Sequence, residues 1–375
     1  FGMTGRTRGG PAKAAVIGSG LVGTVIGSGS ANVATTGVFT IPMMKKVGYK
    51  AHFAGAVEAV ASTGGQIMPP VMGSAAFIMA EFTGISYWNI CLAAAIPAIL
   101  YYLAVFMQVH LEAVKLNLKG MPEEAIPDLM RSLKRGIYLF LPLITIIAFL
   151  SLGYTPTTAA LMAIVTSILV SFVRKETRIT PRKFVEALIS GARMATFVAA
   201  ACATAGIVVG VIVYSGLGLR LTSILISAAG GNLSVALVFI AIAALILGMG
   251  MGTTAVYVTV AALMVPALIM LKIPLLVAHM FAFYFGCVSL FTPPVATAAY
   301  VAAGIAGAGV LRTATTATRL GITALIVPFM FVYGPSLLLI GSPGEIVWSF
   351  ITASIGVCAL AVALEGYALR RVSIP

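Results

Sequence analysis

The chain has 375 residues, of which 60% are hydrophobic and only 9% are charged, and its mean hydropathy is +1.09. Soluble domains carry about a quarter charged residues, so this chain has too few charges to cover a surface that faces water. The composition therefore excludes a soluble enzyme, a nucleic-acid-binding protein and a disordered chain, in spite of the formal net charge of +13. It predicts an all-α polytopic membrane protein that lies in a lipid bilayer.

The polar, Gly-rich segment that begins at Phe1 lacks the apolar core of a signal peptide, and we expect the chain to be part of a longer protein. Because a spanning helix needs about 20 apolar residues, six uninterrupted stretches are predicted to cross the membrane: Trp88–His110, Gly136–Leu152, Thr157–Val173, Met194–Tyr214, Leu320–Leu339 and Ile346–Leu369. Four other apolar stretches contain Gly, Ser, Thr or Pro interruptions: Ala12–Met44, Ala51–Ala80, Leu233–Leu271 and Leu275–Gly309.

The four interrupted stretches follow two patterns. The first and third contain Gly-rich turns at Gly27–Asn32 and Gly248–Thr254, and their arms of about 15 residues are too short to span comfortably. Each is predicted to form a re-entrant helical hairpin. The second and fourth contain Pro69–Pro70 and Pro293–Pro294. Because proline lacks the N–H donor and disfavours helix in the residue before it, each is predicted to be a helix broken in mid-membrane.

These patterns recur at one offset, since Pro42 plus 224 is Pro266 and Pro69 plus 224 is Pro293. The same offset puts the two Gly-rich turns in register. The chain is therefore predicted to contain a duplicated unit of hairpin, return loop and broken helix.

The positions of the basic residues predict that the two units have opposite orientations. Alternating the spans puts all 23 Lys and Arg residues, except Arg220 and Lys272, on the cytoplasmic side, as the positive-inside rule requires. The first hairpin then enters from the cytoplasm, and the second, which ends at Lys272, enters from outside. Inverted repeats whose discontinuous helices meet near the midplane are typical of secondary transporters.

The two hairpin turns are the candidate binding sites. Irregular backbone inside a bilayer is tolerated only where it lines a cavity or is buried in protein. Helix N-termini attract carboxylates, and backbone carbonyls and hydroxyls suit Na⁺. The alternative at both turns is a Ser/Thr-rich packing interface. Candidate oxygens or open positions at the two turns come from Ser28, Ser30, Asn32, Thr35 and Thr36, and from Gly250, Gly252, Thr253, Thr254 and Thr292.

Glu58 is an acidic residue well inside a predicted helix, and such residues are costly and often functional. Three roles remain open for it: a proton carrier, a residue that supports the site near Gly64–Gln66, or a partner of Lys45 or Lys46. The Gly18–Gly23 segment has the G-x-G-x-x-G pattern, but no acidic residue follows it before Glu58. Close helix packing explains this segment better than a nucleotide site.

No enzymatic chemistry is predicted. The three histidines lie near predicted membrane boundaries rather than at the depth of the turns, so an intramembrane protease is a remote alternative and no catalytic residue is assigned. The four cysteines are far apart and lack the spacing of a metal site or a disulfide framework. These residues are His52, His110, His279, Cys91, Cys202, Cys287 and Cys358.

Several motifs resemble the large, DctM-like permease subunit of TRAP transporters. They are Ser28–Asn32 followed by Pro42 and Lys46–Tyr49, the Gly64–Pro70 break and the second Gly-rich hairpin. The sequence of Thr63–Gly73 is most similar to that of the fused permeases that work with TAXI-type binding proteins. TRAP systems are tripartite, ATP-independent and periplasmic, with a solute-binding protein, a small membrane subunit and a large subunit.

The resemblance implies an elevator-type transporter of the bacterial inner membrane. Na⁺, with no organic cofactor, would drive uptake of an organic acid delivered by a periplasmic binding protein, together with a small TRAP subunit or its fused N-terminal equivalent. Residues 1–87 and 233–309 would form the transport repeats, 88–232 the scaffold helices with basic cytoplasmic loops, and 310–375 the C-terminal membrane helices. A related symporter or exchanger that needs no binding protein is the alternative, and proton coupling through Glu58 remains open.

Carried over to matching positions, the resemblance implies two Na⁺ sites and a substrate site between the turns. The Na⁺ sites would lie near Ser28, Ser30, Asn32, Gly64, Gly65 and Gln66, and near Gly250, Gly252, Thr253, Thr254 and Thr292. Substrate would lie within reach of Ser30, Asn32, Thr35, Thr254 and Thr297.

Overall fold

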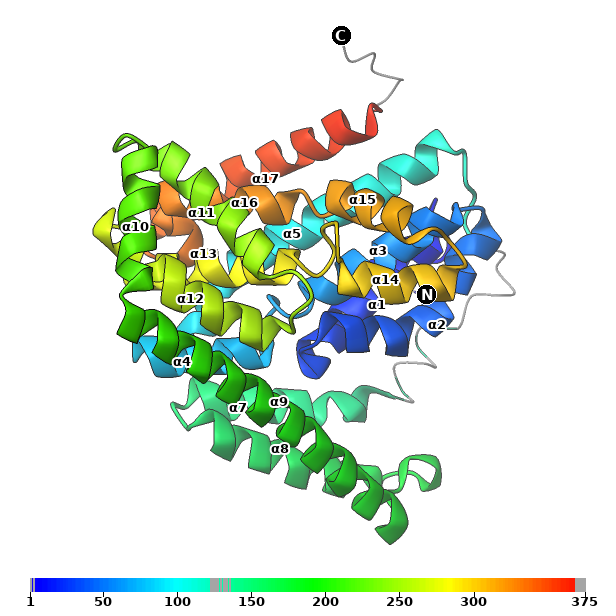
Figure 1. Ribbon diagram of the computed structural model, residues 1–375. Coiled ribbons are helices and arrows are strands. Elements are labelled where there is room, and N and C mark those ends of the chain that lie inside the picture. Colours follow the sequence, from blue (N-terminus) through cyan, green and yellow to red (C-terminus); the bar gives the residue numbers. More distant parts are fainter. Residues whose placement is uncertain are drawn as a thin grey trace.

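The computed structural model describes residues 2, 4–121, 128, 130, 134 and 136–367. These residues form helices and no β-strand (Figure 1), which confirms the predicted all-α class. Within the described ranges, five helices are long and apolar enough to cross a membrane: Tyr87–Lys115, Pro181–Ile212, Thr253–Met270, Val310–Tyr333 and Pro343–Glu365.

The first repeat has the predicted hairpin and broken helix. Helices α1 (Gly10–Ile26) and α2 (Gly29–Val47) are joined by a two-residue turn, in which Gly27 has a φ of +66° and donates its backbone N–H to Gly23. Helix α3 (Ala51–Gly64) is followed by an irregular segment containing Pro69–Pro70, and α4 (Ser74–Thr83) continues beyond it.

The second repeat has the same order of elements. Helices α11 (Leu233–Leu247) and α12 (Thr253–Met270) form its hairpin, and α13 (Leu275–Val288) and α14 (Thr297–Ala306) form its broken helix. Figure 1 shows the two hairpins entering from opposite ends of the molecule, with their turns facing each other in the middle. The Lys45 Nζ donates to the Ala306 carbonyl at 2.7 Å. This bond brings the C-terminal ends of α2 and α14 together, as oppositely oriented repeats require.

The core surrounds the two helices that precede the breaks. Every residue of α3 from Phe53 to Gly64 is buried, and so is every residue of α13 from Val277 to Val288. Small residues dominate α3, which allows α1, α2, α14 and α15 to pack closely around it. Aromatic side chains dominate α13 and contact those of α16.

The remaining helices surround these repeats. On one side, α7 (Leu141–Ser151), preceded by the 3₁₀ turn η2 (Ile137–Phe140), lies with α8 (Pro156–Ser171) and α9 (Pro181–Ser215) at the bottom of Figure 1. Helix α10 (Leu217–Ala228) crosses the left end of the same view. The others are α5 (Tyr87–Lys115), η3 (Lys175–Thr177), α15 (Val310–Leu320), α16 (Thr323–Tyr333), η4 (Pro335–Leu338) and α17 (Pro343–Glu365).

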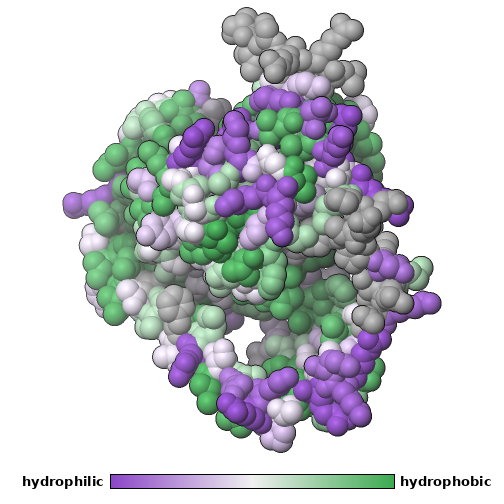
Figure 2. Space-filling model, turned by 90° about the vertical axis from the view of Figure 1, so that its right-hand side faces the viewer, coloured by the Kyte–Doolittle hydropathy of each residue, from purple (hydrophilic) through white to green (hydrophobic). Residues whose placement is uncertain are grey.

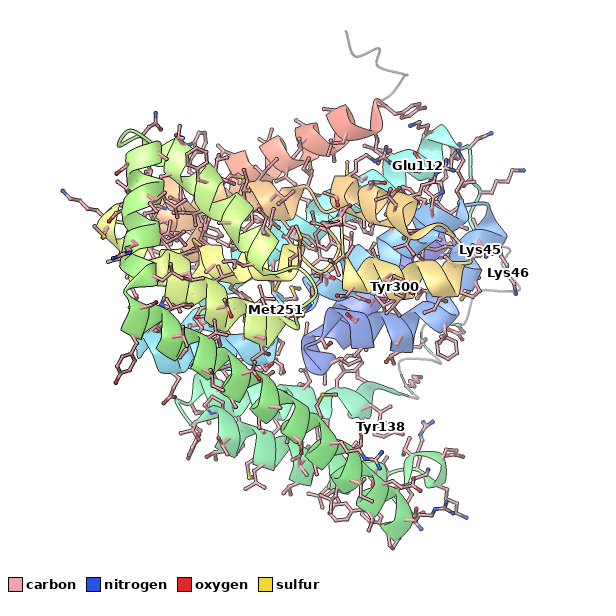
Figure 3. The ribbon with its side chains drawn as sticks, in the orientation of Figure 1. Lys45, Lys46, Glu112, Tyr138, Met251 and Tyr300 are labelled. Atoms are coloured by element: carbon pink, nitrogen blue, oxygen red, sulfur yellow. The ribbon has the colours of Figure 1, made fainter. Side chains whose placement is uncertain are left out.

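Polar side chains gather at the end of the molecule where α2 ends and α3 begins. Figure 2 looks at this end and shows hydrophilic residues over several elements of the face. Figure 3 shows Lys45, Lys46 and Glu112 at the same end. This is the end that the charge distribution predicts to face the cytoplasm.

The predicted span Leu320–Leu339 has the wrong bounds, because the candidate membrane helix is Val310–Tyr333, with a local irregularity at Gly321. A Cβ on Gly321 would lie 2.6 Å from the Phe291 ring, so the close approach of this ring requires a glycine there. Beyond Tyr333, Gly334 and Pro335 prevent the helix from continuing. The predicted span Trp88–His110 corresponds to Tyr87–Lys115, and Gly136–Leu152 and Thr157–Val173 correspond to the shorter apolar helices Ile137–Ser151 and Pro156–Ser171. The span Ile346–Leu369 corresponds to Pro343–Glu365, and its predicted end at Leu369 lies outside the described residues.

The helix predicted to begin at Met194 begins at Pro181 instead. Arg182, Lys183 and Arg193 therefore lie on α9 rather than in a loop, because Pro181 is well suited to the first turn of a helix and no proline follows it within α9. Helix α10 was not predicted as an element. Its Arg220 reduced the apolar signal, and the αL conformation of Gly216 separates it from α9.

Gly65 tests the close packing of the first repeat. A Cβ at this position would lie 2.5 Å from the backbone of Gly23, which cannot rotate away. We expect Gly65→Ala to destabilise the folded protein by about 1–3 kcal/mol, the usual cost of overpacking, and to lower its apparent melting temperature in detergent. Gly304→Ala on α14 is the matched control, because a Cβ at Gly304 meets open space. Equal melting temperatures for the two variants would contradict the packing of α1 against this break.

Candidate functional site

A cavity of about 280 Å³ lies between the two hairpin turns. Both turns, the break between α3 and α4, and one face of α9 form its walls. No Lys, Arg, Asp, Glu or His is among its lining residues. They are Val25, Ile26, Gly27, Ser28, Val71, Met72, Ser74, Phe77, Met194, Val198, Ala201, Gly252, Thr253, Thr254 and Ala255.

Helix N-termini supply the positive electrostatic potential that this cavity lacks in side chains. The N-terminal ends of α2, α4 and α12 all contribute residues to the cavity wall. None of these three ends is capped by a side-chain hydrogen bond, so their first backbone N–H groups remain available. Each N-terminus carries about half a positive charge. The cavity can therefore attract an anion without a basic side chain.

Side chains from one repeat contact the break of the other. The hydroxyls of Ser74 and Thr254 lie 2.5 Å apart, and those of Ser30 and Thr297 lie 3.5 Å apart. The two contacts are related by the repeat, because Ser30 plus 224 is Thr254 and both partners begin the second half of a broken helix. In addition, Thr253 donates to the buried Gln66 Oε1 at 2.5 Å.

The first predicted Na⁺ site contains a buried amide with an unused acceptor. Asn32 is fully buried, and its Nδ2 donates to the Ser19 carbonyl at 2.7 Å, while its Oδ1 has no partner. A Cβ on Gly23 would lie 2.9 Å from Asn32 Nδ2 and 3.0 Å from the Cα of Gly65, so α2 meets the break here. Buried polar atoms rarely lack a partner, and a bound cation would satisfy this oxygen.

The second predicted Na⁺ site lies where the other turn meets the break after α13. Gly250 has a φ of +79°, and a Cβ there would lie 3.7 Å from Val295. Ser289 donates to the Gly248 carbonyl at 3.1 Å. Thr292 lies on the same break, but its hydroxyl donates to the Val288 carbonyl at 2.8 Å.

Four of the predicted site residues line the cavity, namely Ser28, Gly252, Thr253 and Thr254. Thr35, Asn32 and Gly64 are among those that lie away from its wall. Thr35 is on the exposed face of α2, and its hydroxyl donates to the Ala31 carbonyl of the same helix. Asn32 lies behind the turn, against α1. Gly64 packs against Tyr101, whose ring would be 2.3 Å from a Cβ at that position. Thr35, Asn32 and Gly64 therefore contact other parts of the structure and not the cavity.

Glu58 lies inside the first repeat with all of its surface buried. Four hydroxyls contact its carboxyl oxygens: Ser19 at 2.8 and 3.0 Å, Thr36 and Thr40 at 2.5 Å each, and Ser62 at 3.0 Å. The ion pairs formed among the described residues do not include it, and Lys45 donates to Ala306 instead.

The sequence matches the family described as "Tripartite ATP-independent periplasmic transporter, DctM component" over residues 1–346. The chain belongs to this family. This is a family of transporter components and not of enzymes. Its apolar helices are compatible with a multi-pass protein of the inner membrane.

Curated relatives agree with this membership. The chain is 29% identical over 170 residues to a putative TRAP transporter large permease protein of Haemophilus influenzae, covering 45% of this chain and 40% of the relative. It is 29% identical over 178 residues to the C4-dicarboxylate TRAP transporter large permease protein DctM of Pseudomonas aeruginosa, covering 47% and 41%. A 2,3-diketo-L-gulonate TRAP transporter large permease protein of Escherichia coli is 28% identical over 163 residues, covering 43% and 38%. The matches thus span about 40% of each relative's length.

Sequence reasoning missed several residues of this DctM-family site. Ser74 follows the break at Pro69–Pro70, and Ser289 precedes the break at Pro293–Pro294. The 224-residue offset could have drawn attention to Ser74, because it lies next to Gly73, the counterpart of Thr297. Met194, Val198 and Ala201 line the cavity from α9, and no local pattern distinguishes them from lipid-facing residues of the same helix.

Cysteine cross-linking can test the contact between the second turn and the first break. In a variant without the four native cysteines, we expect Ser74→Cys with Thr254→Cys to form a disulfide under mild oxidation. The two hydroxyls lie 2.5 Å apart, which brings the two Cβ atoms within about the range that a disulfide needs. A mass shift on non-reducing gels after proteolysis would report it. Ser74→Cys paired with Thr352→Cys on α17 is the control, and equal cross-linking in both pairs would contradict the contact.

Proposed function

We propose that this DctM-family chain forms the permease core of a Na⁺-coupled importer of small organic acids. In this proposal it works with a periplasmic solute-binding protein of the TAXI type and with a small TRAP membrane subunit or its fused equivalent. The observation that carries the proposal is the cavity of about 280 Å³ onto which three uncapped helix N-termini converge without a basic side chain.

The chemistry of the cavity favours a carboxylate. Three helix N-termini offer backbone N–H donors to an anion, and the hydroxyls of Ser28, Ser74 and Thr254 add neutral hydrogen-bonding groups. The volume suits a small organic acid rather than a large ligand. The names of two relatives, a C4-dicarboxylate permease and a 2,3-diketo-L-gulonate permease, describe solutes of this general class.

Coupling to a cation would supply the positive charge that a bound organic anion needs in this cavity. An organic anion that enters an apolar cavity without Lys or Arg needs more positive charge than helix dipoles supply. The unpartnered Asn32 Oδ1 lies beside the first turn, and carbonyl and hydroxyl oxygens surround the second. Hard cations prefer such oxygen ligands. Na⁺ bound at these two positions would neutralise the substrate charge and link uptake to the Na⁺ gradient.

The arrangement of the helices suggests which parts move. The two hairpins and two broken helices contact one another around the cavity, whereas α9 covers it from one side through Met194, Val198 and Ala201. Helix α9 belongs to the group of helices at the bottom of Figure 1. In the proposed elevator mechanism, the paired repeats slide past these helices and carry the cavity from one side of the membrane to the other.

Thermal stability in detergent gives the first test of the Na⁺ sites. A ligand that binds only the folded state stabilises it by about 2.7 kcal/mol at a concentration of 100 Kd. We expect the melting temperature to rise saturably with NaCl, but not with KCl or choline chloride at equal ionic strength. Thr254→Val should weaken this Na⁺ response by about tenfold or more in apparent affinity, because one desolvated oxygen ligand is lost. Thr352→Val, on the exposed face of α17, should leave it unchanged.

Uptake by proteoliposomes tests the transport reaction itself, with the full-length protein and its cognate partners. We expect an inward Na⁺ gradient and the binding protein together to drive accumulation of a labelled C4-dicarboxylate or a related acid. Ser74→Ala should reduce the initial rate by about tenfold, the order of one lost hydrogen bond to a charged group. Uptake without a binding protein would instead support an independent symporter, and identical curves in Na⁺, K⁺ and choline would remove Na⁺ from the proposal.

A further inference from the structure

Glu58 occupies a position that the proposed transport site does not use. Its carboxyl lies on α3, away from the cavity wall, and the hydroxyls around it come from three helices. Ser19 is on α1, Thr36 and Thr40 are on α2, and Ser62 is on α3 itself. Three of the four hydroxyls therefore belong to the first hairpin, and the carboxyl belongs to the helix against which the hairpin packs.

The hydroxyl groups in this cluster have fewer protons than contacts. Thr36 Oγ1 lies 2.8 Å from the Asn32 carbonyl and 2.5 Å from Glu58 Oε1. Thr40 Oγ1 lies 3.1 Å from the Thr36 carbonyl and 2.5 Å from Glu58 Oε2. Each hydroxyl has a single proton to donate, so these two supply two protons to four contacts. A proton on the carboxyl would supply a third proton to these contacts.

No positively charged side chain among the described residues balances Glu58. No ion pair among the described residues includes it, and an ionised carboxylate without a cation is costly in an apolar interior. Several titratable side chains on helices packed against α3 have partners elsewhere: Lys13 contacts Thr7, Lys45 contacts Ala306, Tyr101 and Tyr102 donate to backbone carbonyls of α3, and Arg319 pairs with Glu365. His110 Nδ1 on α5 and the Tyr284 hydroxyl on α13 are buried without a hydrogen-bond partner among the described residues. His52 and Arg312 lie near the cytoplasmic ends of α3 and α15.

We propose that Glu58 is a proton-binding site whose occupancy latches the hairpin α1–α2 against α3. With the hairpin closed, the protonated carboxyl is neutral and hydrogen-bonded on both oxygens. Moving the hairpin away would remove Ser19, Thr36 and Thr40 from the carboxyl and admit water, in which the ionised form is stable. The closed state therefore binds the proton more tightly than the open state, and by linkage a bound proton favours closure.

The latch is connected to the turn at the tip of the hairpin. Ser19 contacts Glu58 through its hydroxyl and accepts a hydrogen bond from Asn32 Nδ2 through its carbonyl. Thr36 contacts both Glu58 and the Asn32 carbonyl. Asn32 is thus held by two residues of the proton site. Only the role of closure in transport rests on the proposed function, because proton binding itself is a property of these residues.

Infrared spectroscopy of the full-length protein can detect the proton directly. With ¹³C-labelled glutamate, we expect the isotope-shifted C=O stretch of a protonated carboxyl at acidic pH and its disappearance at alkaline pH. Glu58→Gln should remove the Glu58 contribution to this band, and Glu365→Gln identifies the separate contribution of the buried Glu365. Glu81→Gln, the same change at an exposed position on α4, should retain it. A wild-type protein without the band across this pH range would overturn the proposal.

Hydrogen exchange tests the latch. After correction for the intrinsic pH dependence of exchange, peptides from residues 10–47 should exchange up to about tenfold faster per pH unit above the midpoint, the limit for one linked proton. Peptides from α17 should show no such change and serve as the internal control. In Glu58→Gln, whose neutral amide mimics the protonated state, the pH dependence should vanish. Exchange of residues 10–47 that is independent of pH in the wild type would overturn the latch.

A second variant keeps the test informative if Glu58→Gln fails to fold. Thr40→Val preserves shape but removes the hydroxyl from Glu58 Oε2, so the carboxyl band should persist and move to higher frequency. An unmoved band would contradict the hydroxyl cluster. The two proposals fail separately: Na⁺-specific stabilisation without the carboxyl band would leave only the transport function, and the band without any Na⁺ response would leave only the proton site.

Discussion

The need to satisfy backbone polar groups inside an apolar medium governs this structure. Four helices are interrupted in the middle of the molecule, and each interruption exposes N–H and C=O groups that a membrane cannot hydrate. The fold brings the interruptions together, so that each turn lies against a break. Glycines make this possible, since the backbone of Gly27 lies beside Gly73 and that of Gly23 beside Gly65. Side chains at these glycine positions would hold the backbone polar groups of the turn and of the break apart.

The electrostatic character of the site follows from the same arrangement. When helices are interrupted in pairs and meet tip to tip, their N-termini converge and create positive potential without a charged residue. A fixed Lys or Arg would hold an anion permanently and would itself be costly to bury. In the proposed function, backbone dipoles combined with exchangeable cations would provide a charge balance that can change during a transport cycle. The absence of basic residues from the cavity wall thus agrees with a transport role for a DctM-family protein.

The two repeats share a backbone plan but differ in their buried polar groups. Repeat one contains Glu58 with its ring of hydroxyls, whereas the equivalent helix α13 is filled with aromatic side chains. Where Gly65 lets the backbone of Gly23 approach, the second repeat has Ser289, which bonds to Gly248. The second repeat has buried polar side chains of its own, because His279 Nδ1 on α13 and the Tyr257 hydroxyl on α12 lie 2.7 Å apart. The two repeats therefore share the geometry of the paired turns but not the kind of polar group that they bury.

The sequence by itself determined the class of the protein, the two hairpins, the two breaks and their pairing by a constant offset. These features depend on local physics: apolar length, glycine in turns and the missing N–H of proline. Ser30 and Thr254 could likewise be singled out from the sequence, because the 224-residue offset relates them. The long helix α9 was only partly predicted, since its basic first turns mask a helix that continues without a break.

Only the tertiary structure decided which side chains meet. Ser74 contacts Thr254 because helices from the two repeats meet there, and Thr36 contacts Glu58 because the successive helices α2 and α3 pack together. The hydropathy pattern does not show where two helices meet. The same holds for Thr35, whose hydroxyl points along its own helix and away from the cavity. The hydrophobic periodicity of a sequence indicates which face of a helix is apolar, but the neighbouring helices decide what each face contacts. The cavity, the unpartnered Asn32 oxygen and the surroundings of Glu58 are all consequences of that packing.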